Sequence, residues 1–396
     1  MTKLEKLIQE FCPDGVEFRP LEQCCNILDR KRKPVTKSSR EAGKYPYYGA
    51  NGIQDYVSDY IFDGTFILVG EDGSVITDRG TPVVTWASGK IWVNNHAHII
   101  EGNGTVLLRF LYHYIQTIDV SPLIHGNIPK LTGGDFRALT IPVPPLEVQR
   151  EIVRILDTFT ELTAELTAEL TARQKQYEYY RDMLLSFGEN GGGETGNNIN
   201  FFLVAEIADT NIGLATTVTK YKANQGVLLI HNSDIQENEI VLKQHEYITE
   251  AFAEKNHKKR LQENDVITVH TGDIGTSAVI SKEYAGAIGF TTITSRIRNP
   301  QKVLPEYFCH YLNSHRCKAE IASMTISDRS NLNQNCFEKL RIPIPPIDEQ
   351  RRIVTILDHF STLCTDLTSG LPAEIEARKK QYEYYRDNLL SFTPAD

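Results

Sequence analysis

The stretch IPVPPLEVQREIVRILDTF, residues 141–159, returns as IPIPPIDEQRRIVTILDHF at residues 342–360. A second stretch, ARQKQYEYYRDMLLSF at residues 172–187, returns as ARKKQYEYYRDNLLSF at residues 377–392. In each copy, a block whose sequence diverges between the two copies precedes these nearly identical stretches. The chain is therefore a tandem repeat, and two similar halves predict pseudo-twofold symmetry.

The nearly identical blocks are expected to be long helices. Apolar side chains recur every three or four residues over residues 147–187, which is typical of one face of a helix. About forty residues would form a rod of roughly 60 Å, and a helix of that length needs a partner. The second copy supplies a partner helix that is interrupted at 369–372, where Gly370 and Pro372 stand. We therefore expect two long antiparallel, coiled-coil-like helices, the second of them kinked.

The first helix contains the unit TAEL twice in succession, over residues 163–170. One unit advances a helix by about 6 Å and turns its leucine by roughly 40°. Thr163, Leu166, Thr167 and Leu170 are therefore candidates for a spacer whose length sets separation and twist together. The alternative is a stretch of good helix formers with no further role.

Both helices end in the same string, YEYYRD, at residues 177–182 and 382–387. In the first copy, Tyr177, Tyr180 and Leu184 share one helix face, which leaves the other residues of the string on other faces. Tyrosines buried between the two helices are one interpretation, and a docking surface for another protein is the other. The candidates for docking a partner are Tyr179, Arg181, Tyr384 and Arg386.

The divergent blocks, residues 16–145 and 200–346, alternate short apolar runs with glycine-containing turns and add predicted helices near 107–116 and 305–313. Both are expected to be mixed α/β domains, so the predicted fold class is α+β. The remaining predicted segments are an N-terminal segment 1–15, a central helix 146–187, a Gly/Asn-rich linker 188–199, a C-terminal helix 347–392 and a tail 393–396.

Loops in the divergent blocks are rich in groups that bond to phosphates and base edges, although any one of them alone reads as a plain turn. Each block carries equal numbers of basic and acidic residues within a chain of net charge −9, so charge neither indicates nor excludes DNA. The candidates for DNA contact are Lys31, Arg32, Lys33, Tyr47, Tyr48, Asn51, Asn127 and Lys130 in the first block, and His231, Asn232, Ser233, Lys258, Lys259, Arg260, His270, Thr271, Arg329, Ser330 and Asn331 in the second.

Motifs of catalysis do not occur in this sequence. The repeated prolines are followed by Leu146 or Ile347, not by the aromatic residue with which an amino-methyltransferase stacks on a flipped base. Neither a Gly-x-x-x-x-Gly-Lys-Ser/Thr loop nor Gly-x-Gly-x-x-Gly is found. Asp29-Arg30-Lys31 after Pro13-Asp14 resembles a nuclease pattern, and His96-Ala97-His98 a metal-binding pair, but such short patterns are common by chance. We expect no catalytic residue, no metal site and no bound cofactor.

Length and composition predict a multidomain globular protein: 396 residues, of which 41% are hydrophobic and 23% charged. The sequence holds no run of eighteen apolar residues and no N-terminal secretion signal. Its seven scattered cysteines form no Cys-x-x-Cys pair, which argues against a disulfide framework and a structural zinc site. A reducing cytoplasm is the expected location.

The alternation of variable and repeated blocks, the Pro-x-Pro-Pro-x-x-x-Gln-Arg-x-Ile-Val-x-Ile-Leu-Asp pattern and the TAEL tandem together resemble the DNA-specificity subunit of type I restriction-modification systems. The tandem resembles the IC subgroup most. The resemblance covers essentially the whole chain and identifies residues 16–145 and 200–346 with two target recognition domains.

This resemblance implies a non-catalytic subunit whose domains each read one half of a split, asymmetric double-stranded DNA target. The helices would act as the spacer and dock two modification subunits, which carry S-adenosylmethionine and methylate adenine. Restriction subunits would add cleavage that uses ATP and Mg. Two other functions stay open on the residues alone: a stand-alone nuclease that uses Asp29, and a coiled-coil scaffold that binds only protein.

Overall fold

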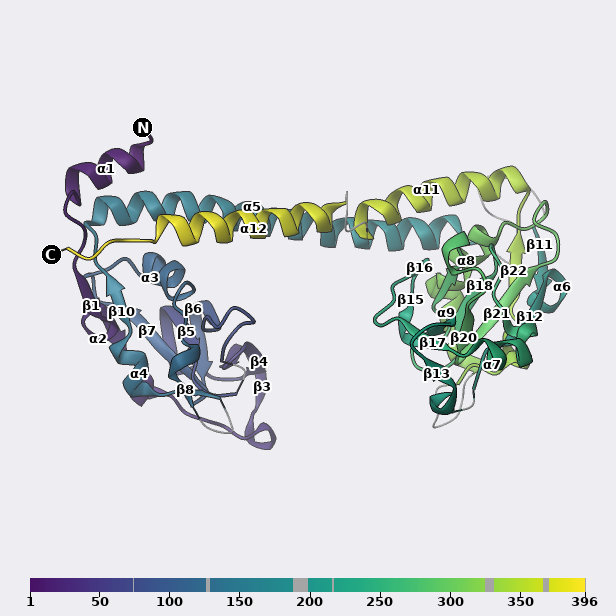
Figure 1. The fold of residues 1–396 in the computed structure, drawn as a ribbon, viewed down its shortest axis with the longest axis horizontal. Helices are drawn as coiled ribbons and strands as arrows, with labels where there is room; N and C mark the ends of the chain where they lie inside the picture. Colours follow the sequence, from purple (N-terminus) through teal and green to yellow (C-terminus); the bar gives the residue numbers. More distant parts are fainter. Residues whose placement is uncertain are drawn as a thin grey trace. The chain divides into compact units, whose positions relative to one another are not determined.

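The computed structural model describes residues 1–73, 75–125, 129–187, 199–215, 217–324, 331–365 and 370–395. The chain divides into two compact units. Unit 1 joins Met1–Thr167 to Glu374–Asp396, and unit 2 comprises Ala168–Ala373. Each unit therefore holds one divergent domain together with helix segments from both repeats (Figure 1).

The domain of unit 1 is built on a six-stranded sheet in the order β2-β7-β5-β6-β3-β4. Both faces of the central strand β5 are buried, because Ile67 and Val69 join one apolar cluster and Phe66 and Leu68 join another. Helix α3 covers the first of these clusters, close to its predicted position. The elements are α2 (Leu21–Cys24), β2 (Cys25–Ile27), β3 (Ala42–Gly49), β4 (Gly52–Val57), β5 (Phe62–Gly70), β6 (Val84–Val93), β7 (Ala97–Gly102), α3 (Leu108–Ile115), β8 (Ile124–His125), β9 (Lys130–Leu131) and α4 (Gly133–Ala138).

The domain of unit 2 contains two four-stranded sheets, in the orders β12-β21-β18-β19 and β13-β17-β14-β20. Helix α8 spans the predicted residues and buries Tyr307, Phe308 and Leu312. The elements are α6 (Val204–Ile207), β12 (Ala208–Ile212), β13 (Lys222–Ala223), β14 (Val227–His231), β15 (Ile235–Gln236), β16 (Glu239–Ile240), β17 (Glu246–Ile248), α7 (Glu250–Lys255), β18 (Val266–Val269), β19 (Ser277–Val279), β20 (Ile288–Phe290), β21 (Thr292–Ile297), α8 (Pro305–Asn313), α9 (His315–Met324) and α10 (Gln334–Phe337).

Both domains are closed by the same short antiparallel strand pair. In unit 1, β1 (Phe18–Pro20) pairs with β10 (Thr140–Pro142), and in unit 2, β11 (Asn200–Leu203) pairs with β22 (Arg341–Ile344). The repeat therefore persists as structure at the start of the divergent blocks, where little of it remains in the sequence.

A buried glutamine explains the repeated proline motif. Gln149 donates to the carbonyl oxygen of Pro144 at 2.7 Å and accepts from the backbone nitrogen of Leu107 at 2.8 Å. In the second copy, Gln350 makes the equivalent bonds to Pro345 and Leu304 at 2.8 and 2.9 Å. Each glutamine thus fastens the start of a long helix to the domain helix beside it, because a buried amide needs all its partners.

The long helices form as predicted and pack antiparallel within each unit (Figure 1). In unit 1, Phe159 of α5 stacks on Tyr385 of α12 with ring centroids 5.1 Å apart, and in unit 2, Tyr180 of α5 stacks on Phe360 of α11 at 5.5 Å. No helix among the described residues is long and apolar enough to cross a membrane. The helices are α5 (Leu146–Leu184), α11 (Ile347–Thr365) and α12 (Leu371–Leu389).

Helix α5 ends at Leu184 and α12 at Leu389, each three residues before the predicted helix ends at 187 and 392. Leu185 and Leu390, the residues that follow, are 2% and 3% exposed. They pack into the apolar clusters of unit 2 and unit 1, respectively, directly after the helix ends.

The two ends of the chain are joined in unit 1. Val16 pairs with Pro394 in a parallel bridge, and Gly15 adopts φ +99° directly against this tail. Helix α1 (Lys3–Phe11) is held to α5 by an ion pair from Lys3 to Glu151 at 2.7 Å. Hydrogen bonds from Arg154 and then Lys3 lower the pKa of Glu151 to about 2.

Candidate nucleic-acid interface

The side chains of the basic run at residues 30–33 of the first domain differ in their exposure to solvent. Arg32 turns inward, where its side chain is 13% exposed and donates to Glu71 at 2.5 Å and to the carbonyl oxygen of Ala97 at 2.7 Å. Lys31 and Lys33 are exposed and have no ion pair within the described part of the chain. Arg32 therefore serves the fold, which corrects its assignment to DNA contact, while the two lysines stay available for phosphates.

Arg32 belongs to a network that ties four segments of the first domain together. Asp29, Glu71 and His98 place one ligand atom each within 4.8 Å of one another, which is a spacing that a metal ion could use. Here Lys130 donates to Glu71 at 3.1 Å, while His98 bonds to Asp29 at 2.7 Å and to the carbonyl oxygen of Leu131 at 3.0 Å. Both ring nitrogens of His98 therefore already have hydrogen-bond partners within the domain.

The charge state of Asp29 fits this description. Burial alone would raise its pKa, but the hydrogen bond from His98, its charge and the backbone nitrogen of Ile99 together lower it. Asp29 is therefore a carboxylate that already has its counter-charges. The network also holds strand β9 in place, because Lys130 bonds to Glu71 and the carbonyl oxygen of Leu131 bonds to His98.

The tyrosines of the first domain serve the core. Tyr47 is 1% exposed and its hydroxyl accepts from the backbone nitrogen of Val35 at 3.0 Å, while Tyr48 is 8% exposed. Burial leaves neither ring a surface for DNA, which corrects their assignment. Asn51 is exposed in the turn between β3 and β4, and Asn127 lies outside the described residues.

In the second domain the structure brings together candidates from three loops. Asn232 donates to the carbonyl oxygen of Thr271 at 2.5 Å, and the Thr271 hydroxyl bonds to Asn331 at 2.9 Å. His270 bonds to Thr271 at 2.8 Å, and burial lowers the pKa of His270, so its ring is neutral near pH 7. Neutral imidazole, amide and hydroxyl groups are those that read base edges.

The other candidates for DNA contact in this domain either lie near that cluster or fall outside the described residues. His231 is paired with Glu246 at 3.1 Å, and Ser233 is exposed in the 3₁₀ turn Asn232–Asp234. Arg329 and Ser330 lie outside the described residues.

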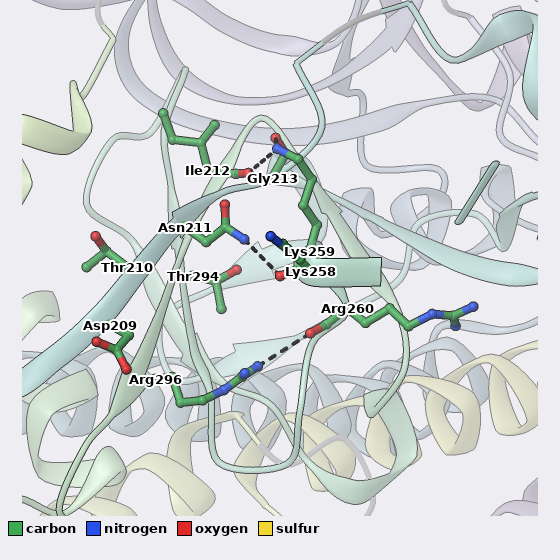
Figure 2. Close-up of a pocket in the computed structure, with 10 residues that line it drawn as sticks. All are labelled: Asp209, Thr210, Asn211, Ile212, Gly213, Lys258, Lys259, Arg260, Thr294 and Arg296. Atoms are coloured by element: carbon green, nitrogen blue, oxygen red, sulfur yellow. Dashed lines mark hydrogen bonds between the residues drawn. The ribbon is translucent and has the colours of Figure 1, made fainter. Parts of the chain in front are cut away.

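Lys258, Lys259 and Arg260 line a cavity of about 220 Å³ together with residues of β12 and β21 (Figure 2). Lys259 donates to the carbonyl oxygens of Ile212 at 2.5 Å and Gly213 at 2.9 Å. The guanidinium of Arg260 points away from the rest of the lining (Figure 2) and bonds to Glu250. The run therefore divides like the run at 30–33, with one lysine turned onto the backbone and Lys258 exposed.

The sequence matches the family model of the type I restriction modification DNA specificity domain over residues 13–173 and 198–377. The chain belongs to this family. Over 410 aligned residues it is 38% identical to a putative type I restriction enzyme specificity subunit of Haemophilus influenzae, with 99% of each chain covered. It is 34% identical to the EcoR124I/EcoR124II specificity subunit of Escherichia coli, covering 72% of this chain and 71% of that one.

Solved structures agree on the fold. The S subunit of a type I restriction-modification system from M. genitalium superposes with a TM-score of 0.57 at 15% identity, covering 95% of this chain and 96% of that one. A chain from a structure of the type I R-M system superposes at 0.59 with 16% identity, covering 96% and 98%. The α+β architecture of the type I specificity subunit is thereby confirmed.

The helices of this type I specificity subunit expose one part of each YEYYRD string and bury another. Tyr179 and Tyr384 are 65% and 66% exposed. Arg181 and Arg386 are 5% and 6% exposed and lie over the rings of Tyr177 and Tyr382, respectively. The two arginines therefore position the helix ends, which corrects their assignment to partner docking. The two exposed tyrosines remain candidates for docking.

The division of the chain into the two units falls within the spacer candidates of α5, directly after Thr167. The hydroxyls of Thr163 and Thr167 donate back to the carbonyl oxygens four residues earlier, at 2.8 and 2.7 Å. Leu166 and Leu170 are partly buried. The tandem is thus regular helix across the boundary.

Sequence reasoning missed the polar anchor of each helix pair. In unit 1, His113 is fully buried and bonds to the Tyr382 hydroxyl at 2.8 Å and to Asp157 at 2.9 Å. In unit 2, the matching His310 bonds to Asp358 at 2.8 Å. The repetition of both histidine and aspartate in the two copies could have revealed these pairs.

Proposed function

We propose that the two domains of this specificity subunit read the two halves of a split, asymmetric DNA target, and that the long helices set the distance between them. The equivalence of the two units carries the proposal: each has one α/β domain, the same closing strand pair and the same buried glutamine. The polar loops differ between the domains, which suits two different half-sites.

The chain is proposed to do no chemistry itself. Two modification subunits would dock on the helices at Tyr179 and Tyr384, which are equally exposed in the two copies of one string. They would carry S-adenosylmethionine and methylate adenine, and restriction subunits would add ATP- and Mg-dependent cleavage. Because each domain on its own is neutral, strong DNA binding is expected only in this complex. The complex would act in the cytoplasm.

Methylation mapping tests this function. The chain is expressed with its modification partner, and methylated adenines are mapped across the host genome. We expect one split sequence with a fixed gap, whose two halves change independently when the two domains are exchanged for those of a relative. A continuous recognition sequence would contradict the proposal.

The two alternatives are separated by different measurements. A stand-alone nuclease requires metal-dependent DNA cleavage by the purified chain that is lost in Asp29→Ala. We expect no cleavage, because Asp29 is already paired with His98. A protein-only scaffold predicts no sequence preference in the methylation map.

A further inference from the structure

The pocket bounded by β12, β21 and the 3₁₀ turn His257–Lys259 holds a positive charge that has no counter-charge among the described residues. The partly buried ammonium of Lys259 bonds only to the carbonyl oxygens of Ile212 and Gly213 among the described residues. Burial lowers the pKa of Lys259, and no carboxylate in the described part of the chain offsets this effect. A partly desolvated charge of this kind is stabilised when an anion approaches.

The other cations of the pocket are not equivalent to Lys259. Arg296 is committed to Asp265, with two bonds of 2.7 and 2.8 Å, and Arg260 is committed to Glu250. Lys258 is exposed and has no ion pair within the described ranges. Asp209, the carboxylate of the lining, pairs with Arg298 at 2.8 Å. Among the described residues, the unpaired charge of the pocket is therefore that of two adjacent lysines.

The floor of the pocket is small and polar. Asn211 of β12 lies opposite Thr294 of β21 in the sheet register, and both line the cavity. Beside them, a Cβ on Gly213 would lie 2.3 Å from the carbonyl oxygen of Gly289, so only glycine fits there. The close approach of these backbones places the carbonyl oxygens that receive Lys259.

The hydrogen-bonding groups of the floor favour a ligand that accepts. One N–H of the Asn211 amide already donates to the carbonyl oxygen of Lys258 at 2.9 Å. The ammonium of Lys258 and the remaining N–H of Lys259 are donors, and the hydroxyl of Thr294 can donate as well. Phosphate oxygens accept several such bonds at once, and lysine binds them as a point charge.

We propose that this pocket holds one backbone phosphate of the DNA bound by the second domain, with Lys258 and Lys259 as its ligands. The inference rests on the proposed function and adds a division of labour to it. Contacts to phosphates fix register and orientation but carry no base identity. The pocket thus positions the domain, while the loops at Asn232, Thr271 and Asn331 remain the candidates for reading bases.

The test compares Lys258→Ala with a matched control, Lys255→Ala, which removes the same charge from an exposed position three residues earlier and outside the pocket. The DNA affinity of the assembled complex is measured as a function of salt concentration. The two substrates are a duplex with the target sequence found by methylation mapping and a duplex with a scrambled sequence. We expect Lys258→Ala to weaken both by about 3- to 10-fold and to reduce the salt slope by about 1. Lys258→Arg should restore both values, and Lys255→Ala should change neither.

Three results would overturn the proposal. An unchanged salt slope in Lys258→Ala means that no phosphate is held there, and a changed methylation sequence means that Lys258 reads a base. Competition by inorganic phosphate at fixed ionic strength, combined with unchanged DNA affinity in Lys258→Ala, assigns the pocket to free phosphate instead. Failure of the proposed function is distinct, because the unsubstituted complex would then methylate no split sequence.

Discussion

Deleting one TAEL unit, residues 163–166, is the sharpest test of the spacer. The change removes four residues from a helix that runs without a break from Leu146 to Leu184. Its length falls by about 6 Å, and everything beyond the deletion turns by roughly 40°. The stacked pairs Phe159–Tyr385 and Tyr180–Phe360 lie on opposite sides of the deletion, so each unit keeps its own helix packing.

The geometry of DNA converts these values into base pairs. One base pair rises by about 3.4 Å and turns by roughly 35°. The lost length corresponds to slightly less than two base pairs, whereas the lost rotation corresponds to about one. Rotation should decide, because a domain reads base edges only while it faces the groove. We therefore expect the gap between half-sites to shorten by one base pair.

Genome-wide mapping of methylated adenines reads out this change directly. The matched control is the isosteric substitution Thr167→Val, which keeps the helix length and should keep the gap. Inserting a third TAEL unit should lengthen the gap by the same amount. An unchanged gap after the deletion, or different bases in either half-site, would refute the argument that α5 sets spacing alone.

Three further predictions concern the anchors of unit 1. Tyr382→Phe removes the hydroxyl that bonds to buried His113, and we expect the free energy of unfolding in a denaturant titration to fall by about 1–2 kcal/mol. Glu151→Gln removes a carboxylate with a pKa of about 2, whose stabilisation is complete above the unfolded value of about 4.3 and is lost as pH falls towards 2. The difference in thermal midpoint between Glu151→Gln and the parent should therefore disappear in acid. Gly15→Ala places a Cβ 2.7 Å from the carbonyl oxygen of Pro394 at φ +99°, and we expect a loss of about 1–3 kcal/mol and faster proteolysis of the tail.

Each of these predictions has a matched control. Tyr384→Phe alters the exposed tyrosine of the same string and should leave stability unchanged. Glu147→Gln alters an exposed carboxylate one turn earlier in α5. Gly104→Ala meets a similar positive φ, +88°, with no atom within 4 Å of the new Cβ, so it separates backbone strain from steric collision. If a variant and its control had equal effects, the contact removed by that variant would not stabilise unit 1 in the way predicted.

Local patterns were enough to predict the helical framework. The spacing of apolar residues predicted α5. The predicted break at 369–372 agrees only in part, because Gly370 lies outside the helices while α12 already begins at Leu371 and includes Pro372. The predicted helix positions in both domains also agree with α3 and α8. These features depend on residues close together in the chain, which periodicity and turn chemistry report directly.

Charged runs could not be interpreted in the same way. Lys31 and Arg32 are neighbours of similar chemistry, yet only Arg32 turns inward, because Glu71 lies beside it from a distant strand. Lys259 is likewise drawn to carbonyl oxygens of β12. Nothing in the run itself distinguishes such residues from their exposed neighbours.

The sequence by itself determined that this chain is a tandem repeat with two long helices and two divergent domains, because repetition and periodicity are local properties. Only the tertiary structure decided that the helix end bearing Tyr382 packs on the first domain and the one bearing Tyr177 on the second. This pairing of helix ends with domains depends on contacts between residues far apart in the chain, such as His113 with Tyr382. Such contacts form where buried polar groups find their partners, and no local pattern records where those partners lie.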